Sequence, residues 1–205
     1  MIKKILWILF ILNALAIGLY PALYFLIDRK FGLLSTKSVA LLENISWNIG
    51  FYVHILGGGL ALLAGWSQFS NKLRTRYLGL HRNLGKLYVI AALLSGGTGF
   101  YIAFFATGGV VAATGFMALA VIWVYTTWRA YQHILQGRIT EHQQWMLYSY
   151  AACFAAVMLR IWLPLLILLL QDFVTAYRIV AWLCWVPNLL VVRLFWAPGL
   201  KVEAG

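Results

Sequence analysis

The sequence predicts an all-α fold: a polytopic membrane bundle of about six transmembrane helices that forms one integral membrane domain over residues 1–205. Hydrophobic residues make up 63% of the chain and charged residues only 10%, whereas a soluble domain is about 25% charged. The apolar residues also gather in six stretches, each close to the roughly 20 residues that a helix needs to cross a bilayer. This composition excludes a sizeable soluble domain and a disordered chain, and two cysteines are too few for a disulfide scaffold.

The predicted spans follow one another with short connections. They cover residues 5–26, 47–69, 84–105, 111–131, 143–170 and 173–194. The first follows Lys3 and Lys4, and because it is too long for the apolar core of a signal peptide, we expect it to be retained. Pro164 in the fifth span and Pro187 in the sixth can each kink a helix. Between the first two spans, residues 27–46 leave room for a short surface helix.

Basic residues predict that both termini are cytoplasmic, because loops on that side of a membrane carry an excess of lysine and arginine. With this threading, most of the 16 cations fall on the cytoplasmic side: Lys3, Lys4, Lys72, Arg74, Arg76, Arg82, Lys86, Arg129, Arg138, Arg193 and Lys201. The net charge of +11 therefore indicates a lipid bilayer with anionic headgroups as the partner. We expect no nucleic acid, since the densest cationic run, residues 71–82, is a short loop between two spans.

Polar side chains inside the spans are few, and because they are costly in a bilayer, such residues usually face the interior of a bundle. The informative ones are His54, Gln68, His81, Tyr88, His142, Ser149 and Arg160. The carboxylates are in loops, at the ends of the chain or at span boundaries: Asp28, Glu43, Glu141, Asp172 and Glu203. Their positions disfavour a paired-carboxylate hydrolase, a carboxylate-bridged metal pair and an intramembrane carboxylate relay. No catalytic motif is present, so whether the chain is an enzyme stays open.

Helical phase places small and polar residues together on three spans. At about 100° per residue, one face of the second span carries His54, Gly58, Ala61, Gly65 and Gln68. The third span carries a similar face with His81, Gly85 and Tyr88. On an unbroken fifth helix, His142 and Arg160 would share one face about 27 Å apart. Such faces either let helices pack closely around hydrogen-bonded histidines or line a cavity for a flat cofactor or a lipid-like substrate.

Depth separates the four histidines into different predicted roles. His81 and His142 each begin a span on the cytoplasmic side, and two imidazoles at one level are the axial pair of a six-coordinate b-type haem. Arg82 and Arg74 lie where haem propionates would emerge, and arginine pairs well with carboxylates. Tyr88 and Gln68 complete this expected cofactor-binding set.

Two further groups are predicted near opposite faces of the membrane. His54 and Arg160 are expected at similar height near the outer side, where they would bind a second haem, a quinone head group or an anion. His133 ends the fourth span beside Arg129, and its position is typical of a solvated interfacial histidine. Cys153 and Cys184 fall within spans and are expected to act as small apolar residues.

The order of these landmarks resembles a bacterial membrane family catalogued as domain of unknown function 2306. The landmarks are His54 before a glycine-rich helix to Gln68-Phe69, then Arg74, His81-Arg82-x-x-Gly85-x-x-Tyr88, His142-x-x-Trp145-Met146, and Ala155-Ala156-x-x-Leu159-Arg160. The resemblance covers about residues 47–165. It implies a multi-pass helical protein of a bacterial inner membrane, and it implies no activity.

A looser resemblance is to the transmembrane b-type cytochromes that carry electrons from ascorbate or quinol. Those proteins ligate one haem near each membrane face, and the resemblance implies His81 and His142 as the cytoplasmic ligands of the haem iron. The outer pair is incomplete here, because His54 on the second span has no histidine to match it on the fourth span.

Three functions remain open from the sequence. The first is a redox protein that binds haem b or a quinone and exchanges electrons with a partner. The second is a non-enzymatic scaffold, assembly factor or transporter-like protein that binds a lipid or anion at Arg160 and His54. The third is a metal site made by the same histidines, which ranks last because they lie at two depths and lack a carboxylate base.

Overall fold

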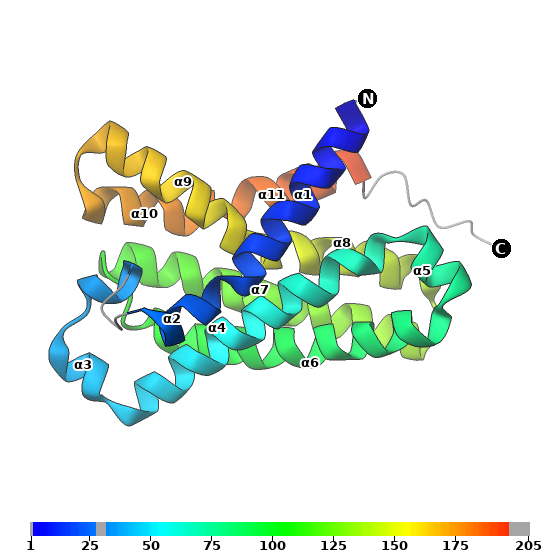
Figure 1. The fold of residues 1–205 in the computed structure, drawn as a ribbon, viewed down its shortest axis with the longest axis horizontal. Helices are drawn as coiled ribbons and strands as arrows, with labels where there is room; N and C mark the ends of the chain where they lie inside the picture. The colour runs from blue at the N-terminus through cyan, green and yellow to red at the C-terminus, as the bar shows by residue number, and fades with distance from the viewer. Residues whose placement is uncertain (1, 28–31, 197–205) are drawn as a thin grey trace. The chain divides into compact units, whose positions relative to one another are not determined.

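The computed structural model describes residues 2–27 and 32–196, and every regular element within those residues is helical (Figure 1). The chain divides into two compact units, Met1–Ile102 and Ala103–Gly205, which are described separately. Three residues assigned from the sequence lie outside the described part of the chain: Asp28, Lys201 and Glu203.

Six helical segments are long and apolar enough to cross a membrane, which confirms the predicted all-α membrane fold. They are Lys4–Leu26, Ile45–Phe69, Leu78–Ala103, Val110–Leu135, Ile139–Leu170 and Phe173–Phe195. Three of them extend by four or more residues beyond a predicted end: the third begins at Leu78, the fourth continues to Leu135 and the fifth begins at Ile139. The added part of the third span includes Arg82, whose long, exposed side chain can lie at a helix end and still reach water. The cytoplasmic placement of both termini stays a prediction.

In the first unit, the first and second spans form an antiparallel pair. The first consists of α1 (Ile2–Leu19), a 3-10 turn η1 (Tyr20–Ala22) that starts around Pro21, and α2 (Leu23–Leu26). The second consists of α4 (Ile45–Gly65) and η3 (Trp66–Phe69). A Cβ atom added to Gly59 would lie 2.6 Å from the carbonyl oxygen of Gly18. Only glycine therefore allows the backbones of α1 and α4 to approach this closely.

The linker between these spans folds onto the ends of the two helices. It forms η2 (Gly32–Thr36) and α3 (Val39–Glu43), which confirms the expected short surface helix. Leu34 and Leu42 pack with aromatic side chains of α2 and α4 in a small core. Burial beside this core lowers the pKa of Lys37 to about 8, because desolvation disfavours the charged ammonium.

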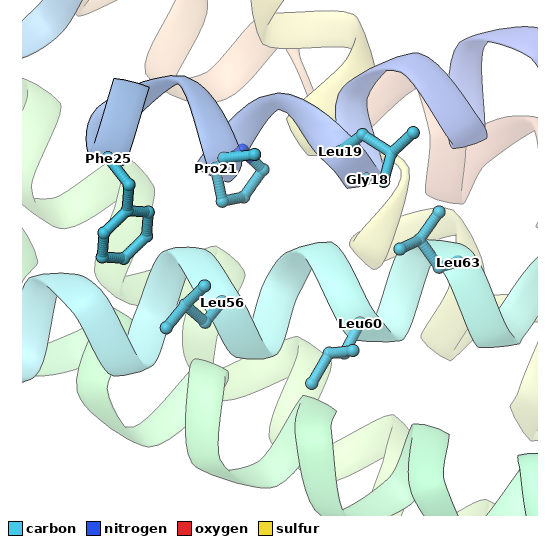
Figure 2. Close-up of a pocket in the computed structure, with 8 residues that line it drawn as sticks. Gly18, Leu19, Pro21, Phe25, Leu56, Leu60 and Leu63 are labelled. Carbon is cyan, nitrogen blue, oxygen red and sulfur yellow. The ribbon is translucent and has the colours of Figure 1, made fainter. Parts of the chain in front are cut away.

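An apolar groove lies between the first span and α4 of the same unit (Figure 2). Its volume is about 260 Å³, and its lining residues are Gly18, Leu19, Pro21, Ala22, Phe25, Leu56, Leu60 and Leu63. No ionisable or hydroxyl side chain lines it, so the groove suits hydrocarbon and offers no group for catalysis.

The cationic loop and the third span complete the first unit. The loop forms the short helix α5 (Asn71–Arg76), which begins where the Ser70 hydroxyl accepts a hydrogen bond from the Leu73 amide. The third span is the single helix α6 (Leu78–Ala103). It runs antiparallel to α4, with Gly50 against Tyr101 at one end and Gln68 against Gly85 at the other.

The second unit is arranged around α7 (Val110–Leu135), which packs against α8 (Ile139–Cys153) and α10 (Phe173–Leu183). A Cβ atom added to Gly115 of α7 would lie 2.8 Å from the Ala181 carbonyl oxygen of α10. At the end of the same pair, Arg178 donates from Nε to the Gly108 carbonyl at 2.8 Å. The unit is completed by α9 (Ala155–Leu170), α11 (Val186–Val191) and a π-helical turn, η4 (Val192–Trp196).

The fifth and sixth spans are both interrupted. The fifth divides into α8 and α9 at Phe154, where the chain changes direction (Figure 1). The expectation of one unbroken fifth helix is therefore wrong, and the predicted phase between His142 and Arg160 does not hold across the break. Pro164 lies inside α9 without ending that helix. In the sixth span, α10 ends before Pro187 and α11 starts around it, because proline lacks the amide proton that helix continuation needs.

Candidate functional site

His54 in α4 is bound to the backbone of α6. Its Nδ1 lies 2.9 Å from the Ser95 carbonyl oxygen, and the Ser95 hydroxyl donates to the His54 carbonyl oxygen at 2.8 Å. Because a carbonyl oxygen can only accept, Nδ1 carries the ring proton and Nε2 carries the lone pair. Ser95 is fully buried, so this reciprocal pair satisfies polar groups within the interface between α4 and α6.

The glycine-rich faces around this pair are in close contact with each other. A Cβ atom on Gly99 would lie 2.8 Å from His54 Nδ1, and one on Gly57 would lie 3.0 Å from the Ala91 carbonyl oxygen. This confirms the interpretation in which small residues let the two helices approach closely. Helix contact, rather than a cavity, occupies this part of the α4 face.

The remaining predicted residues of the first unit lie toward the cationic end of α6. His81 is in the first turn of this helix, and its amide donates to the Tyr77 carbonyl oxygen at 3.0 Å. Tyr88 is fully buried, whereas Arg74 and Arg82 are exposed. The Gln68 side-chain oxygen lies 3.3 Å from where a Cβ atom on Gly85 would stand.

His142 in α8 has the same kind of backbone partner in the second unit. Its Nδ1 lies 2.9 Å from the carbonyl oxygen of Ala130 in α7. The carbonyl again requires the proton on Nδ1 and leaves the Nε2 lone pair for a ligand. Further along the same two helices, the buried hydroxyls of Thr127 and Ser149 are 2.6 Å apart. These two contacts fix how α7 and α8 are aligned.

Arg160 is in α9, beyond the break at Phe154. Its guanidinium donates from Nη1 to the Ala156 carbonyl oxygen, one turn earlier in its own helix, at 2.9 Å. The side chain therefore satisfies a backbone acceptor within the span, which is one way that a charged residue is tolerated at membrane depth.

The structure corrects the interpretation of His133. This residue is only 3% exposed rather than solvated, because the ring stacks on Trp145 of α8 at a centroid distance of 6.4 Å. The guanidinium of Arg129 lies over the same indole ring, 5.6 Å from its centroid. Sequence reasoning missed this cluster, although the spacing of Arg129 and His133, one helical turn apart, was a usable signal.

The predicted site residues divide between the two units. The first unit contains His54, Gln68, Arg74, His81, Arg82 and Tyr88, and the second contains His142 and Arg160. The structure thus connects His54 to Ser95 and His142 to Ala130, each within one unit. The pairing of His81 with His142 and that of His54 with Arg160 stay predictions.

Within residues 2–27 and 32–196, no three histidine, cysteine or acidic side chains are grouped so that they could hold a metal ion. Glu141 lies 4.0 Å from Arg138 in a partly exposed ion pair, and Asp172 accepts a hydrogen bond from the Thr175 amide at 2.8 Å. Cys153 and Cys184 are buried and are not joined by a disulfide.

Comparison with known proteins identifies a family and no function. The family model described as "Predicted membrane protein (DUF2306)" matches residues 51–196, which include all the predicted site residues. This match confirms the family resemblance seen in the sequence. No curated protein and no solved structure matches the chain.

Proposed function

This chain belongs to the DUF2306 family of predicted membrane proteins, and we propose that within the bilayer it binds a b-type haem and transfers electrons. His142 is the proposed axial ligand in the second unit. His81, the partner expected from the sequence, is the proposed second ligand. The membrane is proposed to be the bacterial inner membrane, with both termini on the cytoplasmic side.

The observation that carries this proposal is the contact between His142 Nδ1 and the Ala130 carbonyl oxygen at 2.9 Å. Histidines that ligate metals almost always donate their other ring proton to a carbonyl or carboxylate, which fixes the tautomer and makes the ligating nitrogen more basic. The contact made by His142 Nδ1 is therefore the one expected of a histidine that ligates haem iron through Nε2. A haem bound there would supply one-electron chemistry.

Other residues of the chain take supporting roles in this proposal. The exposed guanidinium groups of Arg82 and Arg74 are suited to pair with haem propionates, and Tyr88 and Gln68 are proposed to border the cofactor. His54 is the proposed quinone contact in the first unit, since its Nδ1 proton is already held by Ser95. Arg160 is proposed to contact a quinone or redox partner in the second unit.

A second candidate function is favoured by a different observation. The small-residue faces of α4 and α6 are filled by each other at Gly57 and Gly99, which supports a packing role for them. A non-enzymatic scaffold, assembly factor or lipid- or anion-binding transporter-like protein would need these faces only for helix packing. Such a protein would be colourless.

The absorption spectrum of the full chain distinguishes the two functions. The protein is expressed with added haem precursor, purified in detergent and measured before and after reduction with dithionite. We expect a Soret band that shifts on reduction and that is lost in His142→Ala. The control is Gln144→Ala, a nearby substitution in α8 with no assigned role, and it retains the band. A colourless wild-type protein overturns the haem proposal and leaves the scaffold.

A further inference from the structure

The end of α7 carries a polar cluster that the haem proposal does not use. Arg129 and His133 are one turn apart on α7, and both contact the indole of Trp145 on α8. Tyr125, one turn before Arg129, packs against the same ring with its edge, at a centroid distance of 5.5 Å. The indole therefore holds the guanidinium and the imidazole on one side of the helix pair.

The polar atoms of this cluster are buried without being satisfied. Within the described part of the chain, neither ring nitrogen of His133 has a hydrogen-bond partner, and the same is true of Arg129 Nε. Leaving several such atoms unpaired in one place is costly, and buried polar groups in native proteins nearly always have a partner. The cluster thus requires a polar group that none of the described residues contributes.

The charge around His133 indicates that this missing group is an anion. The guanidinium of Arg129 and the ring of His133 share the indole of Trp145. The one nearby carboxylate among the described residues, Glu141, is already paired with Arg138. A phosphate offers several acceptor oxygens and negative charge, and can accept hydrogen bonds from a guanidinium and from an imidazole N–H together.

The position of the cluster along α7 is also suitable for a phosphate. His133 lies in the last turn of the fourth candidate span, which ends at Leu135. Lipid headgroups lie at this level of a membrane, and their phosphates are bound by basic pockets between helices. Free phosphate from the aqueous phase reaches the same level.

We propose that Arg129 and His133, held by Trp145, form a binding site for a phosphate group, supplied by a phospholipid headgroup or by free inorganic phosphate. The site lies entirely within the second unit and contains no proposed haem ligand. Loss of haem and loss of phosphate binding are therefore separate outcomes.

The test measures binding to the full chain after it has been stripped of lipid in detergent. Native mass spectrometry compares retention of phosphatidylglycerol with that of diacylglycerol carrying the same acyl chains, which isolates the contribution of the phosphoglycerol headgroup. Equilibrium dialysis with radioactive inorganic phosphate forms the second arm. Binding of phosphatidylglycerol above diacylglycerol identifies a lipid source, and binding in the dialysis arm identifies free phosphate.

The site variants are Arg129→Gln and His133→Gln. The control is Arg193→Gln, which removes an exposed cation elsewhere in the same unit. We expect the first two to weaken binding about tenfold or more, because each loses a charge-assisted hydrogen bond, and Arg193→Gln to bind as the wild type does. Arg129→Lys, which keeps the charge without the planar fork, replaces Arg129→Gln if that variant does not fold. The proposal is overturned if neither probe exceeds its control, or if the folded site variants bind as tightly as Arg193→Gln.

Discussion

The Nδ1 atom of His142 lies 2.9 Å from the carbonyl oxygen of Ala130, so one helix of the second unit fixes the ring proton of a histidine on the next. His54 and Ser95 show the same relationship in the first unit, also at 2.9 Å. Both histidines are within candidate membrane spans. Each is therefore held in the tautomer whose Nε2 can bind a metal or accept a proton.

The contact between α4 and α6 predicts opposite effects for two glycines of the same helix. A Cβ atom on Gly99 would meet His54 Nδ1 at 2.8 Å, whereas one on Gly97 meets no atom within 4 Å. Gly99→Ala should lower the thermal unfolding temperature, because the imidazole must leave its position against Ser95. Gly97→Ala should leave stability unchanged or raise it by up to about 1 kcal/mol, since alanine favours a helix. Equal effects in both variants would contradict this packing.

The hydroxyl pair in the second unit predicts a measurable coupling between α7 and α8. Thr127 Oγ1 lies 2.7 Å from the Trp123 carbonyl oxygen and 2.6 Å from Ser149 Oγ. In a double-mutant cycle with Thr127→Val and Ser149→Ala, we expect a coupling of about 0.6 kcal/mol, the average for hydrogen bonds between membrane helices. Unfolding in mixed micelles of increasing denaturing detergent measures it. Additive single effects would show that the contact stabilises nothing.

The start of α10 predicts a loss of stability in acid. Hydrogen bonds from the side chain and then the amide of Thr175 hold the pKa of Asp172 below its usual value. The stabilisation is fully present above the ordinary carboxyl pKa and is lost as the pH falls through the lowered one. Asp172→Asn should keep the helix cap and lose this acid dependence, whereas Asp172→Ala should lose both. Melting curves of the three proteins between pH 3 and pH 7 check this. Identical acid dependence in wild type and Asp172→Asn would contradict it.

The fold was largely predictable from the sequence, because the spans are set by length and hydrophobicity alone. All six appear, and the break before Pro187 follows from the chemistry of proline. The break at Phe154 was not predictable, since the residues around it, Cys153 and Ala155, carry no helix-ending signal. That break removed the expected phase between His142 and Arg160.

The site was predictable in its residue types and less so in its contacts. Helical phase placed His54 on the glycine-rich face that contacts α6, because periodicity reports which face is buried. The partners are backbone carbonyls of Ser95 and Ala130, and every residue has a carbonyl, so no sequence pattern identifies them. Burial of His133 was missed for a related reason: it depends on stacking against Trp145 of the next helix, which no local sequence pattern identifies.

The central claim, that His142 ligates a haem, is tested most directly by removing its side chain and supplying the imidazole separately. The wild-type protein should show the low-spin spectrum of a six-coordinate haem in electron paramagnetic resonance. His142→Gly should lose that signal and regain it when imidazole is added. Circular dichroism should show that this variant keeps the helix content of the wild type. A haem spectrum that is unchanged in His142→Gly, or a wild-type protein without haem, would contradict the claim.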